Sequence, residues 1–371
     1  MQIIFIGFSL RLLLSIINIY IYALPGSQFD AIAFHEEAIL VDNYLSSIYL
    51  GLDYQYEYRW AYSVFLGLIY FIFGQSIFLA SFLSCVAWLL SALIFRLILI
   101  KLNFSKDNIL YSLILYCLLL PISMVYSSFV LREVYILLFY NLMFLSLINI
   151  NLEIKLKNKF KNLLLLVISC FLLSTFHVSS VYILSSLILI FIAWLILNNL
   201  ENNSQKTLFF IFCIIFLIFL NYEGYIEKVF SLIRDYQKNH FVDGMHYRAQ
   251  YYNEENPIFQ KDYSFFGLIH YIFINFFNYF MQPTFVKVSN LLDFSAFYEN
   301  ALRVLVIFIS LFKILNKFNN KNLFIILLLI WLISEAVYAQ VTVNWGTASR
   351  HHMPGLGLMI ILLFFPLRKK L

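Results

Sequence analysis

The stretch SIFLASFLSCVAWLLSALIFRLILI, residues 76–100, decides the fold class of this chain. It contains one charged residue, Arg96, and it exceeds the roughly 20 apolar residues that a helix needs to cross a bilayer. Similar runs recur along the 371 residues, of which 62% are hydrophobic and only 12% are charged, far from the composition of a soluble domain. The sequence therefore predicts an all-α polytopic integral membrane protein.

The apolar runs predict about ten transmembrane helices. We expect them at residues 3–24, 76–100, 108–130, 134–150, 162–176, 178–198, 207–221, 300–316, 322–341 and 353–367. Two further stretches, 60–73 and 265–281, are too short or too often interrupted by polar residues, so we expect them to be interfacial or re-entrant helices on the outer face. If both crossed instead, the middle of the chain would be inverted, and that alternative stays open.

Charge is divided between the two ends of these helices. Lysine and arginine fill the loops on one side, which the positive-inside rule makes cytoplasmic together with both termini. These residues are Lys101, Lys106, Lys155, Lys157, Lys159, Lys161, Lys206, Lys317, Lys321, Arg368, Lys369 and Lys370. The outer polypeptide then consists of loops at about 25–75, 222–299 and 342–352 within one membrane domain, 1–371. The net charge of +5 comes from cytoplasmic anchoring lysines, so we expect no nucleic acid as partner.

The first outer loop carries acidic residues directly after the first span. Asp30 begins a stretch of helical periodicity and is followed by Glu36 and Glu37. A carboxylate at the lip of a membrane helix can act as a general base or as a metal ligand. Asp is also a favoured N-cap residue, because its oxygen accepts a backbone N–H bond. Both roles are open for Asp30.

The corner between the third and fourth spans has the sequence Leu131-Arg132-Glu133, and Pro121 is expected to kink or open the helix before it. Arg132 either forms a structural ion pair with Glu133 or binds an anionic ligand, since the guanidinium fork suits phosphate. His177 occupies the next outer turn, where it is a packed interfacial residue or a site residue. Arg248 lies in a tyrosine-rich part of the large loop that suits sugars or a membrane-interface belt.

The most specific pattern is Asn344-Trp345-Gly346-Thr347-Ala348-Ser349-Arg350-His351-His352, between the last two spans. Gly346 with Asn344 and Thr347 can expose backbone N–H groups, and Arg350 adds a fixed positive charge. Together they predict an anion site of the nest type. His351 adds a titratable group beside it.

These features resemble the polytopic enzymes that build bacterial surface polysaccharides from polyprenyl-linked sugars. Asp30 after the first span, the Phe73-Gly74-Gln75-Ser76 entry to a long helix and the Pro121 helix before Arg132-Glu133 are similar to GT-C glycosyltransferases. The span count, Arg248 and the residues around Arg350 are similar to repeat-unit polymerases of the Wzy type.

The resemblance implies a GT-C-like fold in a bacterial inner membrane. It also implies transfer of a sugar from a polyprenyl phosphate to a glycan or lipid-linked acceptor at the outer face, or polymerisation of repeat units. The catalytic candidates are Asp30, Glu36, Glu133 and His351, and the phosphate-binding candidates are Arg132, Arg248, Asn344, Thr347, Arg350 and His177. A divalent cation, Mg²⁺ or Mn²⁺, is a candidate cofactor with Asp30 as its ligand.

A transporter or flippase of lipid-linked sugars is the alternative from another class. Such a protein needs polar groups within its spans to form an alternating pathway. Arg11 and Glu335 are the main candidates for those groups, and the chain has no two matching halves.

Overall fold

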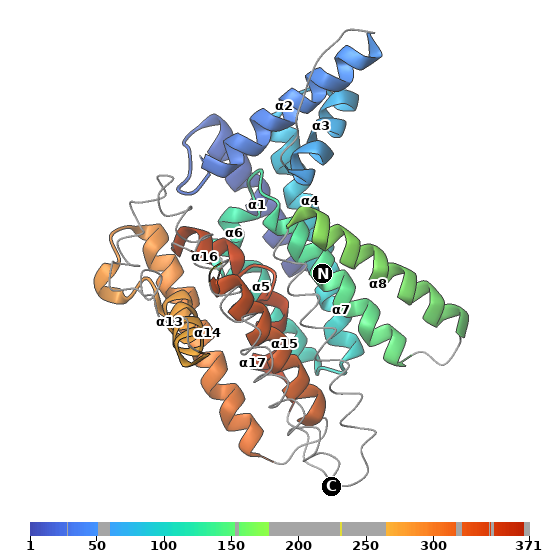
Figure 1. Ribbon diagram of the computed structural model, residues 1–371. Coiled ribbons are helices and arrows are strands. Elements are labelled where there is room, and N and C mark those ends of the chain that lie inside the picture. Colours follow the sequence, from blue (N-terminus) through green and yellow to red (C-terminus); the bar gives the residue numbers. More distant parts are fainter. Residues whose placement is uncertain are drawn as a thin grey trace.

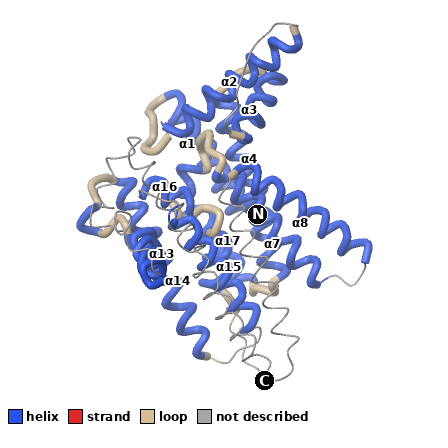
Figure 2. The backbone as a smooth tube through the Cα atoms, in the orientation of Figure 1, coloured by secondary structure: helices blue, strands red, loops and turns tan. Residues whose placement is uncertain are grey.

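The computed structural model describes residues 1–27, 29–50, 60–152, 156–177, 231, 265–316, 321–340, 342 and 345–366. Within these residues the regular structure is helical throughout, and no strand occurs (Figures 1 and 2). The described part of the protein is therefore all-helical, as the hydrophobic pattern predicts.

Five helices of the described residues are long and apolar enough to cross a membrane. They are α1 (Gln2–Tyr20), α4 (Ile77–Lys101), α7 (Glu133–Leu152), α8 (Leu156–Phe176) and α15 (Lys321–Gln340). They confirm helices at five of the expected spans. The count of about ten is not established, because the expected spans 178–198 and 207–221 lie outside the described residues.

Three other expected spans differ from the helices that the structure contains. The stretch 108–130 is divided into α5 (Lys106–Leu118) and α6 (Pro121–Tyr126), because proline cannot donate a backbone hydrogen bond within a continuous helix. Helix α14 (Leu291–Leu315) begins well before residue 300, since Asn290 caps its first turn by accepting from the Asp293 N–H. The last helix, α17 (Leu356–Phe364), is shorter than expected.

The two stretches not expected to cross, 60–73 and 265–281, both contain a helix, α3 (Ala61–Phe73) and α13 (Phe265–Met281). Helix α2 (Phe29–Tyr49) and α3 lie side by side as an arm that projects from the other helices (Figure 1). Their close approach requires Gly67, because a Cβ there would lie 2.4 Å from Val41 Cβ. Helix α13 packs against α14 and α15, and a short 3₁₀ helix (Phe285–Lys287) follows it.

The turns that carry lysine, here called the basic corners, lie together at one end of the helices. Lys313 of α14 donates to the carbonyl oxygens of Leu362 and Leu363 at the end of α17, at 3.0 and 2.8 Å. Asn108, in the first turn of α5, donates to the Phe364 carbonyl at 3.2 Å. Figure 1 shows the α7–α8 corner at the same, lower end and α16 (Trp345–His351) at the opposite end. This separation agrees with the predicted charge division, whereas which end is cytoplasmic stays a prediction.

A buried arginine ties the first helix to the centre of the molecule. Arg11 of α1 donates from Nε to Ser127 Oγ at 2.7 Å and from Nη1 to the Cys117 carbonyl at 3.0 Å. Its guanidinium lies 3.5 Å from the ring centroid of Trp88. These contacts give Arg11 a structural role between α1, α4 and the α5–α6 segment.

Candidate functional site

An ion pair joins two segments 320 residues apart, at the end of the molecule opposite the basic corners. Arg350 Nη1 of α16 donates to Asp30 Oδ2 in the first turn of α2. The Arg350 side chain is 14% exposed and that of Asp30 is 35% exposed. Gly26 permits the preceding turn, because its φ of +86° favours glycine and a Cβ there would lie 2.8 Å from the Tyr126 ring. The structure thus brings together the two residues for which the sequence predicts the most specific roles.

Arg132 lies beside this pair at the N-terminus of α7. Its charge acts on Asp30, and its guanidinium carbon is 5.5 Å from the centroid of Phe34. The buried Arg132 Nε has no hydrogen-bond partner among the described residues, and neither has Glu133 Oε2. An ion pair between these two neighbours is not found in the described part of the chain, so the structural alternative for Arg132 is not supported.

Two histidines, His177 and His351, lie with Asp30, Arg132 and Arg350 and complete what we call the Asp30–Arg350 cluster. The rings of His177, which follows α8, and His351 of α16 are 5.5 Å apart and almost perpendicular. His351 stacks on Tyr338 at 5.1 Å, and its Nδ1 lies 2.7 Å from Thr342 Oγ1. The elements that supply the cluster are therefore α2, the α6–α7 corner, the end of α8, the end of α15 and α16.

The electrostatics of the cluster set its protonation states. Burial would raise the pKa of Asp30, but the charge and hydrogen bond of Arg350, with the charge of Arg132, lower the pKa below its ordinary value. Burial, and then the charges of Arg132 and Arg350, lower the pKa of His177 to about 3. Burial and neighbouring His177, Arg350 and Arg132 lower the pKa of His351 well below its usual range. The cluster thus holds an ionised Asp30 and two neutral imidazoles at neutral pH.

A second group of buried residues, joined by hydrogen bonds around His352, lies next to the Asp30–Arg350 cluster. Its members were not among the predicted site residues. His352 Nδ1 lies 2.6 Å from Glu335 Oε2, and Trp331 Nε1 donates to Glu335 Oε1 at 2.9 Å. His352 Nε2 lies 3.3 Å from the carbonyl oxygen of Tyr279 in α13. This network joins α13, α15 and the α16–α17 turn. Spacing along the sequence could not identify it, because the partners are 17 and 73 residues from His352.

The remaining predicted site residues have different outcomes. Glu36 is exposed and its charge acts on His35, so it is not part of the Asp30–Arg350 cluster. Glu133 is buried and its charge acts on Arg350. Thr347 lies within helix α16, where the sequence predicted a loop with exposed backbone N–H groups. Asn344 and Arg248 lie outside the described residues.

The described residues do not support the expected cation site. They contain no group of three or more His, Cys, Asp or Glu side chains that could hold a metal ion. Asp30, the predicted ligand, is instead paired with a guanidinium. We therefore derive no step through a metal.

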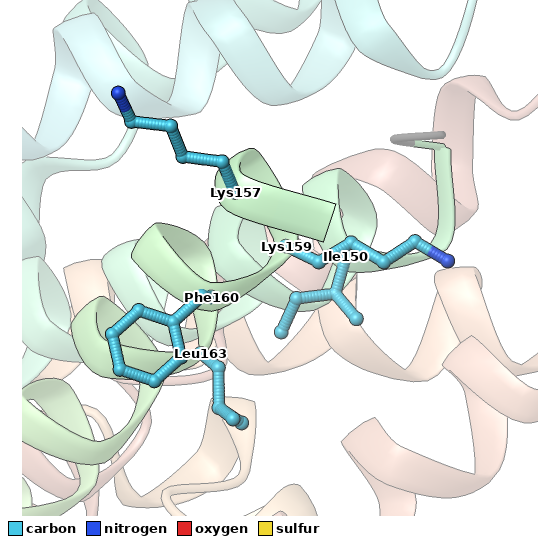
Figure 3. Close-up of a pocket in the computed structure, with 5 residues that line it drawn as sticks. All are labelled: Ile150, Lys157, Lys159, Phe160 and Leu163. Atoms are coloured by element: carbon cyan, nitrogen blue, oxygen red, sulfur yellow. The ribbon is translucent and has the colours of Figure 1, made fainter. Parts of the chain in front are cut away.

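A surface hollow lies at the opposite end of the molecule. It has a volume of about 620 Å³ and is lined by Ile150, Lys157, Lys159, Phe160 and Leu163 at the α7–α8 corner. Figure 3 shows the two lysine side chains pointing apart, with Phe160 and Leu163 on another side. The hollow shares no residue with the Asp30–Arg350 cluster.

No protein-family model, no curated protein and no solved structure matches this chain. The functional inference therefore rests on the geometry of the cluster and on the chemistry of its side chains.

Proposed function

We propose that the protein is a membrane glycosyltransferase that moves a sugar from a polyprenyl-phosphate donor to an acceptor hydroxyl at the outer face of a bacterial inner membrane. The observation that carries the proposal is Arg132. Its buried Nε lacks a hydrogen-bond partner among the described residues, and it lies at the N-terminus of a twenty-residue helix. A helix N-terminus with an arginine favours phosphate.

Of the two arginines in the cluster, Arg132 is the one available to an anionic ligand. The two arginines and the two carboxylates, Asp30 and Glu133, balance formally in the absence of a ligand, but Arg350 is paired with Asp30 while Arg132 Nε has no hydrogen-bond partner among the described residues. Since Arg350 is already paired with Asp30, the donor phosphate binds first at Arg132 in our proposal. Arg350 then stabilises the charge that develops as the sugar leaves, a type of electrostatic contribution that is large in enzymes.

The position of the cluster fits a lipid-linked substrate. It lies at the ends of apolar helices, where the isoprenoid tail remains in the bilayer while the phosphate reaches the arginines. The alternative of a transporter receives less support, because Arg11 and Glu335, the two polar candidates within the spans, form hydrogen bonds to other segments of the chain. Arg11 is held by Ser127 and backbone carbonyls, and Glu335 is held by Trp331 and His352.

The proposal is tested by comparing cells with and without the gene. We expect deletion to remove or shorten a surface glycan and to leave its polyprenyl-linked precursor unconsumed on the outer leaflet. A product stopped at one repeat unit would assign the Wzy-type polymerase reaction to the same site. Precursor confined to the inner leaflet would indicate transport, and unchanged glycans with no accumulated precursor would overturn the proposal.

Sidedness is tested separately by cysteine labelling. Residues near 40, 240 and 348 should react from the outer side, and residues near 104, 157 and 319 only from the cytoplasm. Labelling of residue 157 from the outer side alone would invert the middle of the chain and contradict the proposed topology.

A further inference from the structure

The hydrogen bonds around Thr342 determine which nitrogen of His351 carries hydrogen. Thr342 Oγ1 donates to the carbonyl oxygen of Tyr338 at 2.7 Å, and a carbonyl can only accept. A hydroxyl has one hydrogen, so Thr342 Oγ1 must be the acceptor in its second contact, with His351 Nδ1 at 2.7 Å. His351 is therefore protonated at Nδ1, and its Nε2 carries a lone pair.

The imidazole of His351 is held firmly in that state. Its ring stacks on Tyr338 and faces the edge of His177, and the residue is 7% exposed. The described residues provide no hydrogen bond to its Nε2. The charged and titratable groups that act on it are His177, Arg350, Arg132 and His352, and none of them is an acid. A nitrogen lone pair that has no partner in the described part of the chain, beside two arginines, suits a group that accepts a proton from a ligand.

On the basis of the proposed sugar transfer, we propose that His351 is the general base through Nε2 and that Thr342 is its positioning residue. The oxygen of the acceptor hydroxyl forms a bond to the anomeric carbon while the bond from that carbon to the phosphate oxygen breaks. The electron pair of that bond leaves with the polyprenyl phosphate, and the hydroxyl proton moves to His351 Nε2. Water then takes this proton.

The same geometry makes Asp30 the weaker candidate for the base. Asp30 is paired with Arg350, and the lowered pKa of its carboxyl reduces its affinity for a proton. Burial and the neighbouring arginines lower the pKa of His351 as well, but among the described residues only its Nδ1 has a hydrogen-bond partner, so the Nε2 lone pair is available to a ligand. A phosphate at Arg132 offsets the positive charges that oppose protonation of His351 and makes the imidazole more basic when the substrate is bound.

The first test measures the tautomer and does not depend on activity. Histidine-selective ¹³C and ¹⁵N labelling of the full-length protein in lipid vesicles should show, among the histidine signals, a signal of the Nδ1–H tautomer that disappears in His351→Gln. In Thr342→Val, which keeps the volume but removes the acceptor, this signal should change. In Thr342→Ser, which keeps the hydroxyl, it should stay. A signal of the Nε2–H tautomer assigned to His351 in the unsubstituted protein would overturn the inference.

The second test measures transfer in membranes from the deletion strain, which supply the accumulated polyprenyl-linked precursor as the probe. General bases contribute about 10²- to 10⁴-fold, so His351→Gln should lower the rate by that factor at equal protein amount. Thr342→Val should lower it roughly tenfold and shift the acidic limb of the pH–rate profile, as expected of a residue that acts through the base, whereas Thr342→Ser should stay within about twofold.

The outcomes separate the two proposals. If the unsubstituted protein transfers no sugar, the proposed function fails, and the tautomer measurement still stands by itself. If the unsubstituted protein is active and His351→Gln remains within a few-fold of it, the proposed function survives and the base role of His351 is wrong. A loss in Thr342→Val that follows protein amount with an unchanged pH profile would make Thr342 merely structural.

Discussion

Two arginine–carboxylate pairs of this protein differ in burial and in how completely the hydrogen bonds around them are satisfied. Arg303 of α14 donates to Glu299 Oε2 at 3.1 Å and to Asn300 Oδ1 at 2.9 Å. Glu299 Oε1 also accepts the Ile122 N–H at 2.8 Å, so the pair anchors the first turn of α6. Arg350 and Asp30 form the other pair, and Arg132 beside them has a buried nitrogen without a partner in the described chain.

The adjacent histidines show the same contrast. His352 has an acceptor oxygen within hydrogen-bonding distance of each ring nitrogen, whereas His351 has a partner at Nδ1 alone among the described residues. Native structures satisfy nearly all buried polar groups, and a residue left incomplete calls for a functional explanation. The Glu299–Arg303 pair and the His352 network are therefore structural in our interpretation, and the Asp30–Arg350 cluster is kept incomplete for a ligand.

The largest effect is expected at the satisfied pair. Glu299→Ala leaves the Arg303 charge buried and the Ile122 N–H without its acceptor. Removing one partner of a buried ion pair costs about 3–5 kcal/mol. We expect a strongly reduced amount of protein in the membrane and a lower melting temperature in detergent. Glu299→Gln keeps one of the two acceptor contacts, because its amide has a single acceptor oxygen, and it should cost less than Glu299→Ala. Normal stability of Glu299→Ala would remove the distinction between the two pairs.

Arg350→Lys should show the second largest effect, on activity. Lysine keeps the charge but lacks the fork that can bind Asp30 and a phosphate oxygen together. Loss of one donor of this kind lowers turnover by about 10²- to 10³-fold. The matched control is Arg303→Lys, which should reduce the amount of protein while the sugar transferred per molecule stays near normal. Equal losses of specific activity in both variants would contradict the comparison.

Asp30→Asn should have a smaller effect. Asp30 lies within the first turn of α2 and not at its N-cap, and asparagine has the same size, so α2 should form and the protein should accumulate normally. Arg350 loses the charge that orients it, and we expect transfer to fall roughly 10- to 100-fold, in line with a lost charged hydrogen bond. Transfer is measured per molecule of protein in membranes. Activity within a few-fold of the original would make the role of Asp30 structural.

The smallest of the four expected effects is a loss of stability as the pH is lowered. The folded-state pKa of His177 is about 3, below its ordinary value of 6.5, so the unfolded chain binds the proton first. Stability is then full above pH 6.5 and decreases between about pH 6.5 and 3. Between pH 7 and pH 5 the shifted pKa of His177 lowers the free energy of unfolding by up to about 2 kcal/mol. The melting temperature should fall over that range, and His177→Gln should weaken the dependence. An unchanged slope in His177→Gln would show that His177 is not buried in its neutral form.

The sequence by itself determined the fold class and much of the membership of the cluster. Apolar runs specify membrane helices because each must satisfy its own backbone in lipid, and Pro121 specifies a break because it lacks an N–H. Arg132, His177, Arg350 and His351 could be proposed from their positions at helix ends. The sequence could not show that Asp30 belongs to the cluster and Glu36 does not. Helical periodicity alone does not say which face of the helix packs against the rest of the protein.

Only the tertiary structure decided which of these groups meet and in what chemical state. Asp30 and Arg350 are 320 residues apart, and no local pattern specifies their contact. The hydrogen on His351 depends on Thr342, whose own hydrogen depends on the Tyr338 carbonyl. Such states arise because burial strengthens electrostatic interactions and limits each donor and acceptor to the partners that packing supplies. The residue types were present in the sequence, and their pairing was settled by the packing of α2, α7, α15 and α16.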